Sequence, residues 1–392
     1  MPSRLYQLLL NLLLPCALVY WVKQFFKHQV PWAYFKERLG FLPHLPQEAI
    51  WIHAASIGEL GVAKKIIATL KTSHPVILSC STSKGLVRQE TDFFLPFDHK
   101  WIIQHTYKTL KPKALILIER EIWPNLIQSA TCPVYLINAR LSAKSFKWYS
   151  YTKSLMKQTL KQLSGVWCNG SKDAERLKAL GANITCVHPN IKYLPSTLKT
   201  FEKSYHHHKT FVFSCTHPGE EIILQPIFKA LLAQNPTNHM IIIPRHPHRA
   251  SSIIKALGPS NDERIIVETR FGCTSEWYAQ ATAVFMGGSF VPHGGQNPLE
   301  PLQYNCPSFI GPYYHNFTEV VEALEQANLI TITPSPQTLL NCLENPLQQP
   351  DPKYFLEQQQ QRVENALQLL QSELSKSLDN HVQQVDLETQ EN

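Results

Sequence analysis

Two glutamates in the first half of the chain follow segments with the composition of buried β-strands. Glu59 comes after the apolar run WIHA, within HAASIGE, and Glu119 comes directly after the apolar run ALILI. A carboxylate held by a tight turn can act as a general base, or it can simply cap the helix that follows. Glu121 lies two residues beyond Glu119, and close buried carboxylates need a compensating cation, for which Arg120 and Arg140 are candidates. The pattern therefore indicates either a structural salt bridge or a substrate-positioning site.

A glycine-rich segment in the second half, MGGSFVPHGGQNPLEP (286–301), gives the strongest signal for ligand binding. Its four glycines allow the backbone to approach a ligand closely. Asn297, Pro298 and Glu300 fit the N-cap, first and third positions of a helix. Capping alone does not need four glycines, so we expect a phosphate at this helix N-terminus and ribose hydroxyls near Glu300. The dinucleotide and P-loop glycine patterns are both missing from the sequence.

Two other loops of the second half have the composition of anion-binding loops. THPGEE (216–221) opens a predicted helix, so its backbone N–H groups could face an anion. PRHPHR gathers Arg245, His246, His248 and Arg249, which suits a phosphate or carboxylate, although a solvated basic loop has the same composition. No Cys or carboxylate lies near these histidines in sequence, so no metal site is predicted there.

The elements that must position these motifs are apolar strands alternating with helices. The predicted strands are 51–54, 76–80, 114–118, 134–138 and 166–168, then 210–215, 239–244, 264–267, 283–287 and 308–311. Continuous apolar strands separated by helices are typical of parallel sheets covered on both faces. A break at 189–209 separates the two series, so we predict two doubly wound α/β domains with ligands at the carboxyl ends of their strands, facing a cleft.

Composition excludes several classes of protein. The chain has 392 residues, 44% hydrophobic and 17% charged, which excludes a disordered chain or a coiled-coil rod. A net charge of +7 is mild, and fits an anionic ligand or membrane surface better than nucleic acid. The nine cysteines are widely spaced, without a CxxC pair, which favours reduced thiols.

The N-terminal segment LYQLLLNLLLPCALVYWV (5–22) is apolar and uncharged. It is at the short limit for a membrane span, and Gln7, Asn11 and Pro15 share one helical face, which also fits a helix lying in the cytoplasmic leaflet. A signal peptide is disfavoured, because no cleavage site follows the apolar run. A helix in the core of a soluble domain is the other alternative. More basic residues follow the run than precede it, which places the rest of the chain on the cytoplasmic side. Those that follow are Lys23, Lys27, Lys36 and Arg38.

Six motifs in a fixed order resemble one family. HAASIGE, IEREIWPN, NARLS, THPGEE, PRHP and GGSFVPHGGQNPLEP, behind an apolar N-terminus, resemble the 3-deoxy-D-manno-octulosonic acid (Kdo) transferases, glycosyltransferase family 30. The likeness covers about residues 5–370. It implies a GT-B fold, a CMP-Kdo donor, a lipid A precursor as acceptor, and neither a metal nor a separate cofactor.

The resemblance also assigns roles to residues. Glu59 matches the general base, Glu119 a glutamate that supports the transition state, and Lys192 in PNIKY a conserved lysine of the site. The nucleotide contacts fall on Pro244, Arg245, Phe271, Gly272, Cys273, Asn297, Pro298, Leu299 and Glu300. Two positions depart from the family pattern. The glycine expected before Lys192 is replaced, and Cys273 stands where a glutamate is usual.

The resemblance implies a division of the chain into five parts. These are an anchor helix (1–30), an acceptor-binding α/β domain (31–190), a linker (191–209), a nucleotide-sugar-binding α/β domain (210–350), and a C-terminal helix with a frayed tail (351–392).

The expected activity is inverting, metal-independent transfer of Kdo from CMP-Kdo to lipid IVA during lipopolysaccharide synthesis. We expect it at the cytoplasmic face of the inner membrane, with the membrane surface but no nucleic acid as a partner. A GT-B enzyme that uses a UDP-sugar, or a catalytically silent membrane-attached binding module, is the alternative. The sequence does not decide how many Kdo units are added.

Overall fold

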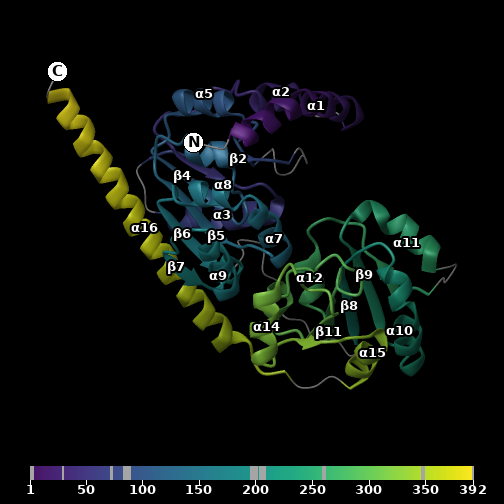
Figure 1. The fold of residues 1–392 in the computed structure, drawn as a ribbon. Coiled ribbons are helices and arrows are strands. Elements are labelled where there is room, and N and C mark those ends of the chain that lie inside the picture. The colour runs from purple at the N-terminus through teal and green to yellow at the C-terminus, as the bar shows by residue number, and fades with distance from the viewer. Residues whose placement is uncertain are drawn as a thin grey trace. The chain divides into compact units, whose positions relative to one another are not determined.

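The computed structural model describes residues 4–28, 31–70, 74–82, 90–194, 202, 209–257, 262–345 and 349–390. The chain forms two compact units. Unit 1 comprises Met1–Leu194 and Gln360–Asn392, and unit 2 comprises Pro195–Gln359. Each unit contains one parallel sheet flanked by helices, as predicted (Figure 1).

The sheet of unit 1 has seven parallel strands in the order β3-β2-β1-β4-β5-β6-β7. They are β1 (Ile50–His53), β2 (Val76–Cys80), β3 (Phe93–Phe94), β4 (Ala114–Ile118), β5 (Val134–Ala139), β6 (Gly165–Asn169) and β7 (Cys186–His188). Every residue of β1, β4, β5 and β6 is buried, because helices cover both faces of the sheet. Burial on both faces of the sheet explains why these strands appear in the sequence as continuous apolar runs.

The helices of unit 1 connect these strands. They are α1 (Arg4–His28), α2 (Trp32–Arg38), α3 (Ile57–Thr69), α5 (Lys100–Leu110), α6 (Pro124–Gln128), α7 (Ala143–Tyr151), α8 (Lys153–Leu160), α9 (Ser171–Ala179) and a short 3₁₀ helix, η1 (Ile191–Tyr193). Ser56 and Ser142 cap α3 and α7 by accepting backbone N–H groups. The core of this unit includes Trp51 and Tyr107, whose hydroxyl donates to the Leu126 carbonyl at 2.8 Å.

Unit 2 repeats the plan with six parallel strands in the order β10-β9-β8-β11-β12-β13. The strands are β8 (Thr210–Thr216), β9 (His239–Pro244), β10 (Ile265–Val267), β11 (Ala283–Met286), β12 (Ser308–Ile310) and β13 (Thr331–Ile332). The helices are α10 (Glu220–Gln234), α11 (Ala250–Leu257), α12 (Thr274–Tyr278), α13 (Leu299–Leu302), α14 (Thr318–Gln326), α15 (Pro336–Glu344) and the 3₁₀ helix η2 (Pro247–Arg249). Phe213, Phe228 and Phe285 lie in its core.

The long helix α16 (Lys353–Gln390) continues from unit 2 into unit 1. Val363, Leu370 and Leu374 are buried, as their helical spacing predicted, and the Tyr135 hydroxyl lies 2.7 Å from Ser377 Oγ. The helix ends at Gln390.

The structure moves the expected domain boundary. The segment 191–209 was predicted as a linker, but η1 lies inside unit 1, where it contacts α3. Lys192 therefore belongs to the first sheet's unit. Residues 195–201 and 203–208 of that predicted linker lie outside the described residues.

The strand order of each sheet reverses at one point. In unit 1 the chain builds β1, β2 and β3 outward in one direction, and then continues with β4 on the other side of β1. In unit 2 the same reversal occurs between β8 and β11. Loops leave in opposite directions at such a point, which opens a crevice at the carboxyl ends of the two strands. Glu59 and Glu119 follow the two central strands of unit 1.

Candidate active site

Glu59 is held at the start of α3 by two local hydrogen bonds. Its Oε2 accepts the backbone N–H of Ala55 at 2.6 Å, and its own N–H donates to Ser56 Oγ at 3.4 Å. The side chain is only 6% exposed. The capping role weighed from the sequence is real, but the carboxylate keeps a second oxygen for other contacts.

Glu119 lies at the end of β4 with a φ of 60° and is 4% exposed. A positive φ is strained for a non-glycine residue and is common at functional sites. Its Oε1 is 3.1 Å from Lys192 Nζ, and its Oε2 is 3.6 Å from an Arg140 guanidinium nitrogen. Both the structural salt bridge and the predicted grouping with Lys192 are therefore present.

Lys192 reaches the site because polar side chains hold η1 in place. Asn190 Oδ1 accepts the Lys192 N–H at 3.0 Å, and Asn138 Oδ1 accepts the Ile191 N–H at 3.1 Å. A Cβ placed on Gly58 would lie 4.0 Å from Lys192 Nζ, so the ammonium also lies beside the start of α3. The replacement of the family glycine before Lys192 does not prevent this position.

A second network of polar side chains lies near the carboxyl ends of the same strands. His53 is fully buried, and its Nε2 is 3.1 Å from Glu121 Oε2, which also accepts the Trp123 indole N–H at 2.7 Å. On the other side of the ring, His53 Nδ1 is 2.9 Å from Ser79 Oγ, and this oxygen accepts the Trp51 indole N–H. An ionised Glu121 can only accept, so His53 Nε2 is the donor to it. In a neutral imidazole Nδ1 is then the acceptor, and Ser79 donates to it.

The electrostatics of these carboxylates differ. Burial, reinforced by the charges of Glu119 and Glu121, raises the pKa of Glu59 to about 7. Burial also opposes ionisation of Glu121, but its bonds from His53 and Trp123 outweigh burial and lower the pKa of that carboxyl. Neighbouring carboxylates with separated pKa values commonly divide acid–base roles. Glu59 has the pKa expected of a general base near neutral pH.

Sequence reasoning missed the supporting residues of this cluster. Asn138 and Asn190 position η1, and His53 fixes Glu121. Arg140, which pairs with Glu119, was already a candidate cation from the sequence. Asn138 has a φ of 53° at the carboxyl end of β5. A polar residue at a strand's carboxyl end was the available signal, because NARLS was among the quoted motifs without an assigned role.

In unit 2 the glycine-rich loop is held by a carboxylate of the chain itself. Glu220 is fully buried and accepts the backbone N–H groups of Gly288, Ser289 and Phe290 at 2.6 to 3.0 Å, and that of His217 at 3.1 Å. The N–H groups of residues 288–290 are therefore directed at Glu220. Within THPGEE, the His217 N–H is likewise bound by Glu220, and the anion site expected at this helix N-terminus stays a prediction.

Close packing within the protein explains most of the glycines. A Cβ on Gly287 would lie 2.7 Å from the Cys215 carbonyl, and one on Gly294 would lie 2.5 Å from Asn316 Nδ2. Gly288 has a φ of 69° and faces the His217 ring. Gly295 has a φ of 74°, and a Cβ there would lie 3.2 Å from Ile310 Cδ1, closer than an ordinary contact. The argument that four glycines imply a ligand is thus weakened.

The two arginines of PRHPHR have different environments. Arg249 pairs with Glu221 Oε1 at 2.9 Å and donates to the Thr216 carbonyl, so it is committed to the fold. Arg245 is half-buried and directly follows the buried Pro244 at the end of β9. Within the part of the chain that the structure describes, the Arg245 guanidinium has no ion-pair partner. Arg245 is the cation of this loop that is suited to a ligand.

The segment 271–273 turns its thiol inward. The Phe271 side chain is 61% exposed, and Gly272 has a φ of 78°. Cys273 is 6% exposed, its Sγ donates to the Arg270 carbonyl at 3.4 Å, and burial raises the pKa of the thiol to about 11. The neutral Cys273 side chain therefore cannot replace a ligand-binding carboxylate. Only the backbone of Cys273 can contact a ligand at this position.

The residues at 297–300 form a short turn of helix. Asn297 Oδ1 accepts the Leu299 N–H at 3.3 Å, and Asn297 Nδ2 donates to Glu300 Oε1 at 3.2 Å. The helix begins at Leu299 with Pro298 as its N-cap, one residue later than predicted.

Cys215, at the carboxyl end of β8, lies near both this turn and the basic loop, so that charges of both act on its thiol. Burial and Glu300 raise the pKa of its thiol to about 11, and Arg245 acts in the opposite direction.

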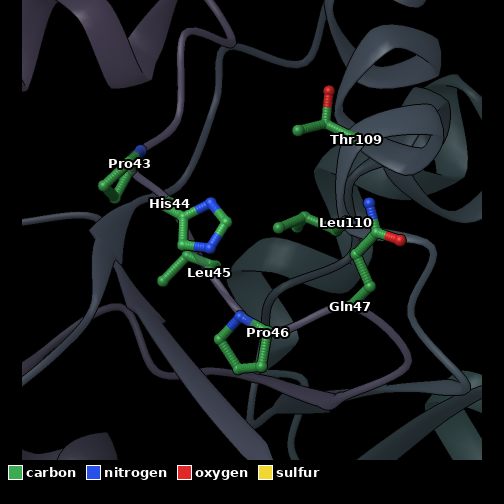
Figure 2. Close-up of a pocket in the computed structure, with 7 residues that line it drawn as sticks. All are labelled: Pro43, His44, Leu45, Pro46, Gln47, Thr109 and Leu110. Atoms are coloured by element: carbon green, nitrogen blue, oxygen red, sulfur yellow. The ribbon is translucent and has the colours of Figure 1, made fainter.

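A pocket of about 250 Å³ lies elsewhere on unit 1 (Figure 2). It is lined by Pro43, His44, Leu45, Pro46, Gln47, Thr109 and Leu110. These residues precede β1 and β4, so the pocket is at the amino ends of the strands, opposite the edge that carries Glu59 and Glu119. It takes no part in the candidate site.

Metal ligands and disulfides were also sought in the structure. No group of three or more His, Cys, Asp or Glu side chains within the described ranges could hold a metal ion. All nine cysteines are free.

Two doubly wound parallel sheets, one in each unit, make up the GT-B fold. A solved UDP-GlcNAc 2-epimerase from Neisseria meningitidis shares this fold, with a TM-score of 0.55 at 12% identity, over 84% of this chain and all of that one. A likeness at this identity concerns the fold alone.

Sequence relatives define the family more closely. A family model described as 3-deoxy-D-manno-octulosonic-acid transferase (kdotransferase) matches residues 33–194. The 3-deoxy-D-manno-octulosonic acid transferase of Haemophilus influenzae is 30% identical over 74% of this chain and 77% of its own length. That of Rickettsia felis is 30% identical over 88% of this chain and 81% of its own. The chain belongs to the 3-deoxy-D-manno-octulosonic acid transferase family, and it is a glycosyltransferase.

Proposed function

We propose that this enzyme transfers Kdo from CMP-Kdo to the lipid A precursor lipid IVA, with inversion at the anomeric carbon. The observation that carries the proposal is the cluster at the carboxyl ends of β1 and β4. It brings a buried Glu59, with a pKa of about 7, together with Glu119 and Lys192. Family membership indicates that the transferred sugar is Kdo, and this cluster contains a base and a cation for the transfer.

In the proposed reaction, Glu59 removes the proton from a glucosamine hydroxyl of the acceptor. The bond between that oxygen and the anomeric carbon of Kdo forms as the bond from the anomeric carbon to the phosphate oxygen of CMP breaks. CMP leaves as the anion, and Glu59 holds the proton. A general base contributes about 10²- to 10⁴-fold to the rate of such a step.

Cationic side chains stabilise the negative charges of the donor in this proposal. Lys192 and Arg140 are already fixed against Glu119, so their positive charge is in place before the reaction begins. Arg245 is the unit 2 residue that would meet the donor phosphate, and Glu300 would accept bonds from the ribose. These charges do the work assigned to a metal ion in other transferases, which makes the proposed reaction metal-independent.

The proposed location is the cytoplasmic face of the inner membrane. The helix segment Arg4–Lys23 has a mean hydropathy of 1.7 over 20 residues and is long enough to cross a bilayer by length and composition. The described charged side chains that are exposed on α1 and α2 are basic, which suits an anionic leaflet.

A thermal-shift comparison of nucleotides tests the donor assignment. CMP should raise the Tm of the full-length enzyme, whereas UDP at the same concentration should not, because binding to the folded state alone stabilises it. Stabilisation by UDP and not by CMP would instead favour a transferase of UDP-sugars. No stabilisation by any nucleotide would favour a silent binding module.

A further inference from the structure

Helix α1 contacts the rest of unit 1 near both of its ends. Near its start, the Tyr6 hydroxyl donates to Asp98 Oδ2 at 2.7 Å, and Gln7 Nε2 donates to Asn125 Oδ1 at 2.6 Å. One turn later, Asn11 Oδ1 lies 2.7 Å from His99 Nε2. Gln7 and Asn11, two of the three residues of the stripe noticed in the sequence, thus bond to the protein.

The same inward face carries apolar contacts farther along the helix. Leu10 and Trp21 are 8% and 6% exposed, and the Trp21 ring packs edge-on against Tyr34 and Phe97. Phe25 contacts Phe35 of α2, and α1 and α2 lie side by side in Figure 1. The docked length from Tyr6 to Phe25 is about 28 Å at 1.5 Å per residue.

The opposite face of α1 is apolar and exposed. It includes Leu5, Leu8, Leu12, Val19 and Phe26, of which Leu5 and Leu12 are each 65% exposed. A stripe of this size on the surface of a soluble protein marks an interaction site. Basic side chains occur at both ends of the helix, at Arg4 and Lys23, and no acidic residue occurs within it.

A helix that crosses a bilayer cannot keep these docking contacts. Asp98 and Asn125 are 4% and 0% exposed, and Asp98 also accepts the backbone N–H groups of Asn125 and Leu126. Crossing would either pull this polar surface into hydrocarbon or leave Asp98 without the Tyr6 hydroxyl. An orientation in the plane of the membrane keeps the contacts and buries only the exposed apolar face.

We infer that α1 lies flat in one leaflet of an anionic phospholipid membrane, with its polar face docked on unit 1, and does not span the bilayer. This rests on the membrane attachment proposed above, but not on the identity of the sugar. Asn125 lies six residues after Glu119, and Trp123 between them is 38% exposed. The docking of α1 therefore places the loop that carries Glu119 and Glu121 at the membrane surface, where a lipid acceptor can reach it laterally.

Labelling of the two helix ends tests the orientation directly. Full-length Arg4→Cys and Lys23→Cys variants are bound to preformed vesicles of phosphatidylethanolamine and phosphatidylglycerol and treated with a membrane-impermeant maleimide. Mass spectrometry of the α1 peptide separates the new thiols from native Cys16. Labelling of both ends in intact vesicles supports the flat orientation. Labelling of Arg4→Cys only after detergent, or failure of the protein to bind the vesicles, contradicts it.

A matched pair of variants tests the two faces. Leu12→Asn changes the exposed face and should weaken vesicle binding about tenfold, the effect expected for losing one buried leucine. Asn11→Leu changes the docked face and should leave vesicle binding within about twofold while lowering the Tm in solution through the lost bond to His99. Unchanged vesicle binding by Leu12→Asn would overturn the inference. Both readouts are independent of Kdo transfer, so they separate this inference from the proposed reaction.

Discussion

At the scale of single residues, the central observation is a pair of carboxylates with different environments. Glu59 has few compensating bonds, whereas Glu119 lies between Lys192 and Arg140. Burial therefore leaves Glu59 as the group whose protonation changes near neutral pH. Glu119 has two cationic neighbours, and Glu121 is hydrogen-bonded by His53 and Trp123.

This environment predicts the pH dependence of transfer. Because burial raises the pKa of Glu59 to about 7, and a general base must be ionised, kcat/KM should rise with pH up to about 7 and then level off. Glu121→Gln removes one of the charges that raise this pKa, so the rising limb should move to lower pH. An unshifted limb in the variant would remove Glu121 from this account.

The same pKa predicts an effect on stability. Folding raises the pKa of Glu59 from 4.5 to about 7, so the folded state binds the proton more tightly and loses stability as pH rises through this interval. The loss is about 3 kcal/mol at most. Glu59→Gln cannot ionise and should raise the free energy of unfolding more at pH 8 than at pH 5. Urea denaturation at both pH values measures this difference, and equal changes would contradict the assigned burial.

The loop between β9 and α11 predicts different outcomes for its two arginines. Arg245→Ala should weaken CMP binding about 10- to 100-fold, because a charge-assisted hydrogen bond is lost. Arg249→Ala should instead leave Glu221 buried without its partner and destabilise unit 2 by about 3–5 kcal/mol. Calorimetric titration and thermal denaturation of both variants distinguish the roles. A normal CMP affinity in folded Arg245→Ala would refute the donor role.

At the scale of elements, the sequence predicted the long buried strands but missed three short ones, β3, β7 and β13, which lie at sheet edges. Continuous apolar runs predict parallel strands because both faces are covered, and residues after such strands meet at one edge. The exact limits of the elements were less predictable. The helix at 299–302 begins one residue late, and η1 joins unit 1, because Asn138 and Asn190 bind its backbone from a distance of many residues.

The glycine-rich loop was harder to interpret for the same reason. Its pattern suggested exposure to a ligand, but Glu220 accepts its N–H groups from a helix about 68 residues earlier. Local spacing cannot reveal a buried carboxylate that comes from another part of the chain. The contacts that this loop makes within the protein could be found only in the structure.

At the scale of the whole molecule, the two units carry different parts of the proposed reaction. The base and its cations are in unit 1, and the proposed nucleotide contacts are in unit 2. Hydrogen exchange with and without CMP should therefore show protection in segments 244–249, 271–273 and 294–300. Protection confined to the β1–α3 and β4–α6 loops would assign the nucleotide to unit 1 and contradict this division.

The docking of α1 also concerns the whole molecule. In the inference drawn above, it brings the loop that carries Glu119 and Glu121 to the membrane surface. The polar stripe of α1 was visible in the sequence, but its meaning was open between a span and a flat helix. Three hydrogen bonds to unit 1 distinguish these orientations. The inference of a flat helix therefore rests on packing against the rest of the chain, which no local pattern contains.

The most direct test of the central claim is the mass of the product made from CMP-Kdo and the tetra-acylated disaccharide lipid IVA. The wild-type enzyme should add one or more Kdo masses to the lipid and release CMP. Glu59→Gln should retain CMP binding but reduce the initial rate of Kdo addition by at least about 10²-fold, the loss expected for a general base. An unmodified lipid with the wild-type enzyme, or full turnover by Glu59→Gln, would contradict the account.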